Sequence, residues 1–217
     1  MGLERLACVM QGVGNLFEVD TVHNILNHVE RITGKTYGRD HATDVSIRVI
    51  TDHIRSTVFM VSDGILPSNE GRGYVLRRLL RRAARHGRML GVTRPFLAEL
   101  CDTVIRENGG AYPELVEHAD YIKKTISAEE ERFSRTIDQG LNILSNLIDN
   151  IEKAAAEGKR RVLAGIDAFK LNDTFGFPLD LTKEIAAENG IEVDEDSFRT
   201  EMQKQREKAR KDRLSRD

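Results

Sequence analysis

Cysteine is scarce in this 217-residue chain, and long apolar runs are missing from it. Its two cysteines, Cys8 and Cys101, form no CxxC pair, and no cluster of histidines accompanies them. This pattern argues against a disulfide framework and against a metal site. No apolar run approaches the roughly 18 to 20 residues of a membrane-spanning helix. Residues 1–5 carry a pair of opposite charges where a secretory signal would be basic and then apolar. We therefore expect a cytoplasmic protein with no membrane partner.

Charge is abundant and unevenly distributed. The whole chain has a formal net charge of −2, and 31% of its residues are charged. Between Gly71 and Ala98, however, there are eight arginines and neither Asp nor Glu. A basic segment in an otherwise acidic chain is typical of proteins that bind a polyanion.

The spacing of apolar residues predicts helices along almost the whole chain. Ile47, Ile50, Ile54 and Val58 recur every three or four residues, as on the buried face of a helix. A similar stripe predicts one long helix over residues 113–156, and shorter helices are predicted over residues 167–173, 181–188 and 194–213. We expect an all-α fold, in which a helical domain with one long helix precedes a smaller C-terminal helical unit.

The arginine-rich segment predicts an amphipathic helix from about Tyr74 to Leu90. At about 100° per residue, leucine, valine and alanine occupy one arc and six arginines occupy the opposite one. These six are Arg77, Arg78, Arg81, Arg82, Arg85 and Arg88. No acidic residue of the same helix stands four positions away to pair with them. The guanidinium fork binds two phosphate oxygens at once, so the helix is predicted to hold phosphate groups. The alternative is a scaffold in which acidic helices elsewhere cover the arginines.

Three runs of sequence resemble the tRNA-recognition region of alanyl-tRNA synthetases, and they occur in the right order. They are residues 48–55, 63–78 and 173–182. The resemblance covers essentially the whole chain and implies three parts. Residues 1–34 would be the end of class II motif 3 with the helices that follow it. Residues 35–158 would be the helical tRNA-recognition domain, and residues 159–217 a C-terminal subdomain that completes the recognition surface.

The resemblance implies that Asn69 and Asp173 recognise the G·U wobble pair in the acceptor stem of tRNA(Ala). Arg72 and the six helix arginines would hold the phosphates of the same stem. The minor groove of an RNA helix is wide and shallow, a carboxylate accepts hydrogen bonds there, and a carboxamide both accepts and donates. From the residues alone, Asn69 in a turn and Asp173 near a helix end are equally explained as structural. Asn172 stands where the family pattern has tyrosine, which leaves the orientation of Asp173 open.

The run Gly2-Leu3-Glu4-Arg5 resembles the end of motif 3 in class II synthetases. The resemblance implies that Gly2, Glu4 and Arg5 belong to an ATP site, with Gly2 allowing close approach of the nucleotide and Arg5 contacting ATP. The strands that carry motifs 1 and 2 do not occur in the sequence. We therefore expect this chain alone to hold no complete catalytic set, to bind no cofactor and to form no alanyl-adenylate. Alanine, ATP and Mg²⁺ would be bound by the parent alanine–tRNA ligase. The alternative is a non-enzymatic helical module that binds RNA or DNA non-specifically.

Overall fold

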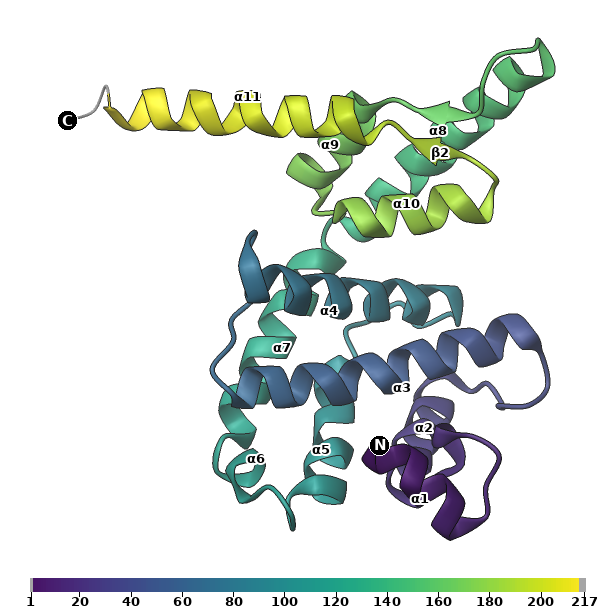
Figure 1. The fold of residues 1–217 in the computed structure, drawn as a ribbon, viewed down its shortest axis with the longest axis vertical. Coiled ribbons are helices and arrows are strands. Elements are labelled where there is room, and N and C mark those ends of the chain that lie inside the picture. The colour runs from purple at the N-terminus through teal and green to yellow at the C-terminus, as the bar shows by residue number, and fades with distance from the viewer. Residues whose placement is uncertain (1, 215–217) are drawn as a thin grey trace. The chain divides into compact units, whose positions relative to one another are not determined.

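The computed structural model describes residues 2–214, of which residues 210 and 212–214 are described by their backbone alone. Nearly all of this chain is helical (Figure 1), which confirms the predicted all-α class. The helices form two compact units, Met1–Ser134 and Arg135–Asp217. The divisions predicted after residues 34 and 158 stay predictions.

Over its described residues, 2–134, the first unit contains seven α-helices and one turn of 3-10 helix, Leu16–Glu18. The helices are α1 (Leu3–Gln11), α2 (Asp20–Thr33), α3 (His41–Ser62), α4 (Gly71–Met89), α5 (Leu97–Asn108), α6 (Pro113–Glu117) and α7 (Ala119–Ser134). Gly34 ends α2 in the left-handed conformation that favours glycine. Gly71, which opens α4, also has a positive φ.

Helix α3 lies at the centre of the first unit, against α4, α2, α5 and α7 (Figure 1). The predicted stripe on this helix, Ile47, Ile50, Ile54 and Val58, is completely buried. Burying four such side chains contributes roughly 1.5 to 3 kcal/mol each to folding. Helix α4 therefore packs against a helix that is itself firmly held in the core.

The second unit contains α8 (Ile137–Ala156), α9 (Gly165–Phe175), α10 (Leu179–Glu188) and α11 (Glu195–Leu214). Two short parallel strands, β1 (Val162–Leu163) and β2 (Glu192–Val193), pair Val162 with Glu192 and Leu163 with Val193. Phe177 is fully buried and packs so closely on Gly140 of α8 that a Cβ there would lie 2.2 Å from its ring. Gly165 opens α9, where a Cβ would lie 2.3 Å from the Phe198 nitrogen of α11. These contacts fix α9 between α8 and α11.

The prediction of one long helix over residues 113–156 is wrong. The chain leaves the helical path at His118 and again at Arg135 and Thr136, so α6, α7 and α8 replace it. The Thr136 hydroxyl donates a hydrogen bond to the Phe175 carbonyl, 2.9 Å away. Phe133 is buried in the first unit and Ile137 in the second. The apolar spacing continues across the break because each segment fills its own core.

Candidate nucleic-acid interface

Asn69 lies in a loop that folds closely over the start of α4. The Ser68 nitrogen donates to the Gly73 carbonyl at 3.1 Å, and the Ser68 hydroxyl donates to the Glu70 carbonyl at 2.8 Å. A Cβ on Gly73 would lie only 2.3 Å from the Leu66 carbonyl oxygen. Glycine at this position therefore permits the close approach, which presents Asn69 as an exposed side chain beside α4.

The carboxamide of Asn69 is held by an arginine of α4. Nη1 of Arg77 donates a hydrogen bond to Oδ1 of Asn69. A guanidinium group can only donate, so its partner must be the carbonyl end of the amide. The contact therefore assigns the two ends of the carboxamide and directs Nδ2 away from Arg77.

Arg77 is in turn fixed by a buried carboxylate of α7, that of Glu129. Oε1 of Glu129 accepts from Nε of Arg77 at 2.9 Å, and from Nε and Nη2 of Arg81 at 2.9 and 2.7 Å. The other oxygen, Oε2, lies 3.7 Å from Nη1 of Arg132. Glu129 is only 3% exposed. One buried carboxylate thus holds the guanidinium groups of Arg77 and Arg81 and lies close to that of Arg132.

These ion pairs bear on an alternative that the sequence left open. Acidic helices elsewhere were one possible cover for the arginines, and for Arg77 and Arg81 such a partner is present, because Glu129 reaches them from α7. A run of three glutamates in a helix, such as residues 129–131, is usually solvated, but Glu129 and Glu130 are both buried. Arg81 also lies over the Phe133 ring at 5.2 Å, and burial lowers the pKa of its guanidinium. Pairing rules within one helix do not detect such partners.

The arginines of the segment differ in exposure. Arg72 is exposed, Arg77, Arg78, Arg82 and Arg88 are half-buried, and Arg81 and Arg85 are buried. The predicted cationic face therefore contains exposed, half-buried and buried arginines rather than uniformly exposed ones. Of these seven residues, the exposed one, Arg72, stands at the start of α4, three residues from Asn69.

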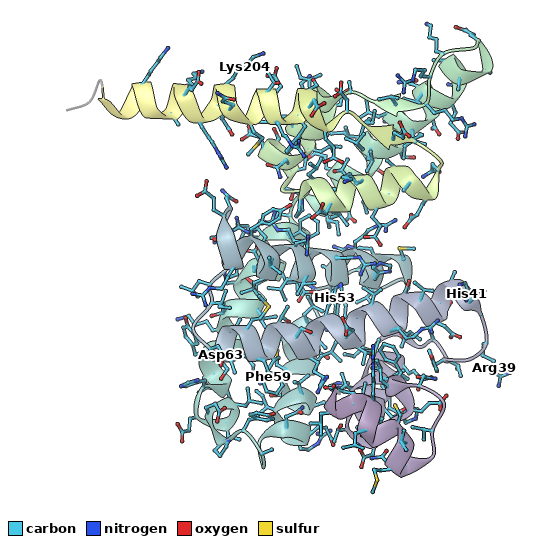
Figure 2. The ribbon with its side chains drawn as sticks, viewed as in Figure 1. Arg39, His41, His53, Phe59, Asp63 and Lys204 are labelled. Carbon is cyan, nitrogen blue, oxygen red and sulfur yellow. The ribbon has the colours of Figure 1, made fainter. Side chains whose placement is uncertain are left out.

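A second contact holds α4 to α3 through His53 (Figure 2). Nη1 of Arg82 lies 2.8 Å from Nε2 of His53, and Nδ1 of the same ring lies 2.9 Å from Oδ2 of Asp52. Because the guanidinium donates, Nε2 accepts and Nδ1 carries the proton that it donates to Asp52. This hydrogen bond is the main cause that lowers the pKa of Asp52. The chain Asp52–His53–Arg82 orients another predicted phosphate ligand.

Glu130, beside Glu129 on α7, caps the first turn of α5. Its two carboxylate oxygens accept from the backbone nitrogens of Phe96 at 3.0 Å and Leu97 at 2.9 Å. These bonds favour the ionised carboxylate, but burial outweighs them and raises the pKa of Glu130 to about 7.

Asp173 lies near the end of α9 in the second unit, and its side chain is exposed. Nε2 of Gln205 on α11 donates a hydrogen bond to its Oδ1. The neighbouring Asn172 does not support Asp173. Instead, Nδ2 of Asn172 donates to the Phe177 carbonyl at 3.2 Å, within the bend that follows α9. Gln205 is thus the residue that orients Asp173, and nothing in the local sequence indicated it.

Residues 2–5, which are predicted to be the end of motif 3, begin the described chain. Glu4 Oε1 accepts from Nη2 of Arg55 on α3 at 2.6 Å, and this bond lowers the pKa of Glu4. Arg5 is exposed. Gly2 has an ordinary extended conformation, with φ −79° and ψ 144°. The observed contact of Glu4 ties α1 to α3, while the exposed Arg5 is free of steric cover and suits a phosphate group or an adenine ring.

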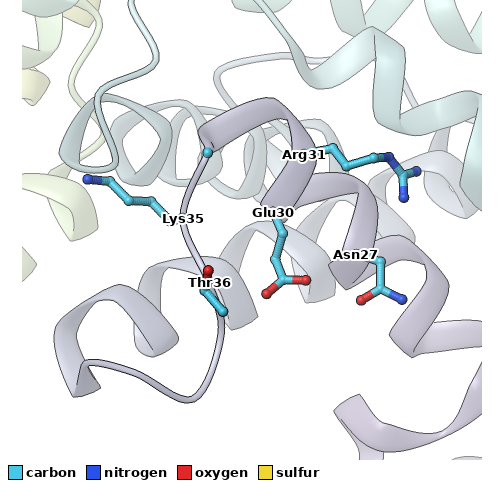
Figure 3. A pocket seen from close by; sticks show the side chains of 6 residues that line it. Asn27, Glu30, Arg31, Lys35 and Thr36 are labelled. Atoms are coloured by element: carbon cyan, nitrogen blue, oxygen red, sulfur yellow. The ribbon is translucent and has the colours of Figure 1, made fainter.

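A hollow lies elsewhere in the first unit, at the end of α2 (Figure 3). It has a volume of about 480 Å³ and is lined by Asn27, Glu30, Arg31, Gly34, Lys35 and Thr36. In this hollow, Oε1 of Glu30 accepts a hydrogen bond from the Tyr37 backbone nitrogen at 2.6 Å. None of the predicted site residues lines this hollow.

Among the residues that the structure describes, no group of three or more His, Cys, Asp or Glu could hold a metal ion. In the same part of the chain, no helix is long and apolar enough to cross a membrane.

The family model for class II (A) tRNA synthetases matches residues 1–217. The chain belongs to this family. Three proteins named alanine–tRNA ligase illustrate the similarity. That of Acetivibrio thermocellus is 60% identical over 212 residues, which are 98% of this chain and 24% of that protein. Those of Alkaliphilus oremlandii and Clostridioides difficile are each 58% identical over 217 residues, all of this chain and 24% of each protein.

The family assignment confirms the resemblance predicted from residues 48–55, 63–78 and 173–182. The chain spans 24% of the length of these relatives, so it corresponds to one part of a longer synthetase. Within that part, Asn69 is bonded to Arg77, and Arg77 and Arg81 are both bonded to Glu129. It brings Asp173 to Gln205 in the other unit.

Proposed function

We propose that this chain is the part of an alanine–tRNA ligase that recognises the acceptor stem of tRNA(Ala) at its G·U wobble pair. The observation that carries the proposal is an identity of 58 to 60% along the whole chain with proteins of that name. The complete protein would join alanine to tRNA(Ala) in the cytoplasm, with ATP and Mg²⁺ as its other requirements.

Asn69 and Asp173 are the proposed base-reading residues. Both are exposed, and each has one side-chain oxygen held by a donor from a neighbouring helix. The guanine 2-amino group of a wobble pair lacks the partner that cytosine would offer, and a carboxylate accepts strongly from it. A side chain held in one orientation loses less conformational entropy when it binds.

The arginines of α4 are the proposed phosphate ligands. Arg72, Arg78, Arg82 and Arg88 are exposed or half-buried and are proposed to contact the RNA backbone directly. Arg81, which is bound to Glu129, would act through its positive potential instead. Phosphate contacts position a nucleic acid, whereas base contacts specify it.

At the N-terminal end of the chain, the residues proposed to adjoin the ATP site of the complete enzyme are Gly2, Glu4 and Arg5. Arg5 would hold a phosphate group or stack on the adenine. Glu4, which is paired with Arg55, would keep α1 in place against the tRNA-binding helices.

The proposal is tested by the binding of two RNA minihelices that differ only in the wobble pair, G·U against G·C. We expect Asn69→Ala and Asp173→Ala each to lower the preference for G·U, by an amount equivalent to about 1 to 3 kcal/mol. Asn150→Ala and Asp149→Ala, two exposed positions of α8, are matched controls that should keep the preference. Equal binding of both minihelices by the unchanged protein would instead support a non-specific RNA-binding module.

A further inference from the structure

We infer that Arg77 and Glu129 are positioning residues for Asn69, and that they set the selectivity of the protein without touching the base pair. The inference rests on the proposed role of Asn69 in base recognition. It concerns a chain of three side chains from three segments: the loop before α4, α4 itself and α7.

The geometry of the guanidinium group links the two ends of this chain. Nε of Arg77 is bound to Glu129 and Nη1 of the same group is bound to Asn69. A guanidinium is planar and rigid, so fixing Nε fixes the direction in which Nη1 donates. The position of the Asn69 carbonyl is therefore determined by a carboxylate on another helix.

Glu129 is a firm anchor because it is buried and engaged by several donors. It is 3% exposed, and its Oε1 also accepts two hydrogen bonds from Arg81. Charge-assisted hydrogen bonds of this kind are shorter and stronger than neutral ones. The side chain of Arg77 is only 13% exposed, so water competes little for the bond that orients it.

The consequence for recognition lies in the orientation of the Asn69 carboxamide. Arg77 must face Oδ1, which leaves the two hydrogens of Nδ2 and the second lone pair of Oδ1 for the RNA. A freely rotating amide would offer either end to a donor or an acceptor and would discriminate less. A lysine at position 77 would keep the charge, but its ammonium lacks the rigid fork that connects both partners.

The test measures affinity for the G·U and G·C minihelices in the full-length protein, with the ratio of the two affinities as its readout. We expect Arg77→Lys and Glu129→Gln each to lower this ratio about fivefold to tenfold, within the range of one base contact. The double variant Asn69→Ala/Arg77→Lys should show the same ratio as Asn69→Ala alone, because Arg77 acts through Asn69. A double variant that is less selective than Asn69→Ala would overturn the inference.

Arg132→Lys is the matched control. Arg132 also lies beside Glu129, but at Oε2, and its side chain is 67% exposed. The substitution keeps the charge and should leave the affinity ratio unchanged. If Glu129→Gln does not fold, as circular dichroism would show, Arg77→Lys decides the question alone.

The outcomes separate this inference from the proposed function. If Asn69→Ala leaves the ratio unchanged, the proposed role of Asn69 fails. If Asn69→Ala lowers the ratio while Arg77→Lys and Glu129→Gln do not, the role of Asn69 stands and the positioning inference fails.

Discussion

The two proposed base-reading residues are supported in different ways. Asn69 is held by Arg77, which is anchored on the buried carboxylate of Glu129. Asp173 is held by Gln205, and both of these side chains are exposed. Among the described residues, the first unit buries Arg81, Arg85, Glu129 and Glu130, whereas the buried polar residue of the second unit is Thr182.

The comparison shows two levels of preorganisation. Breaking the Arg77–Glu129 ion pair would leave a buried charge without its partner, so the guanidinium that donates to Asn69 is held firmly in place. An exposed amide–carboxylate bond exchanges readily with water and contributes little net free energy. Asn69 is therefore the more rigid of the two residues and Asp173 the more adaptable.

The largest effect is expected from removing the anchor. Glu129→Ala would leave the guanidinium groups of Arg77 and Arg81 without their shared carboxylate, so we expect a loss of about 3 to 5 kcal/mol in the free energy of unfolding. Urea denaturation measures this change. The neighbouring exposed position supplies the control, since Glu131→Ala should change stability by less than about 0.5 kcal/mol. If both substitutions had a small effect, Asn69 would be anchored no more firmly in the first unit than Asp173 is in the second.

A slightly smaller effect concerns Glu130, the second buried carboxylate of α7. Its pKa is raised to about 7 in the folded protein, above the value of about 4.3 that an unfolded chain would have. The folded state thus binds the proton more tightly, so this contribution to stability is fully present below about pH 4 and is lost as the pH rises through 7. We expect a loss of about 3 to 4 kcal/mol across that window.

The measurement compares urea unfolding of the original protein and of Glu130→Gln at several pH values. The difference between the two curves isolates Glu130 from carboxylates such as Asp52, whose lowered pKa has the opposite effect. The variant should lose this part of the pH dependence. Parallel curves would show that Glu130 ionises normally.

An intermediate effect is expected at the loop that carries Asn69. Gly73→Ala would place a Cβ 2.3 Å from the Leu66 carbonyl, so the loop must move away from α4. We expect a loss of about 1 to 3 kcal/mol in stability, together with weaker discrimination between the two minihelices. Gly110→Ala is the control, because a Cβ there meets nothing within 4 Å and its φ is not positive. Thermal unfolding and minihelix binding test both parts.

The sequence predicted the helices and the candidate residues of this site better than the hydrogen-bond partners that hold those residues. The stripe from Ile47 to Val58 predicted the burial of α3, and the resemblance pointed to Asn69 and Asp173. The partners of these two residues could not be predicted, because Glu129 lies 52 residues from Arg77 and Gln205 lies 32 residues from Asp173. The break at Thr136 was missed for a related reason. Apolar spacing records which side of a helix is buried, but not which core receives it.

The smallest effect is expected in the second unit. Gln205→Ala would remove the exposed hydrogen bond to Asp173, and exposed bonds of this kind contribute about 0.5 kcal/mol, so we expect the G·U preference to fall only about twofold. Gln203→Ala is the matched control, since Gln203 bonds to Glu207 on the same helix. Binding of the two minihelices provides the readout. A fall as large as that of Arg77→Lys would show that Asp173 depends on a fixed partner as strongly as Asn69 does, which would contradict the difference in rigidity between the two residues.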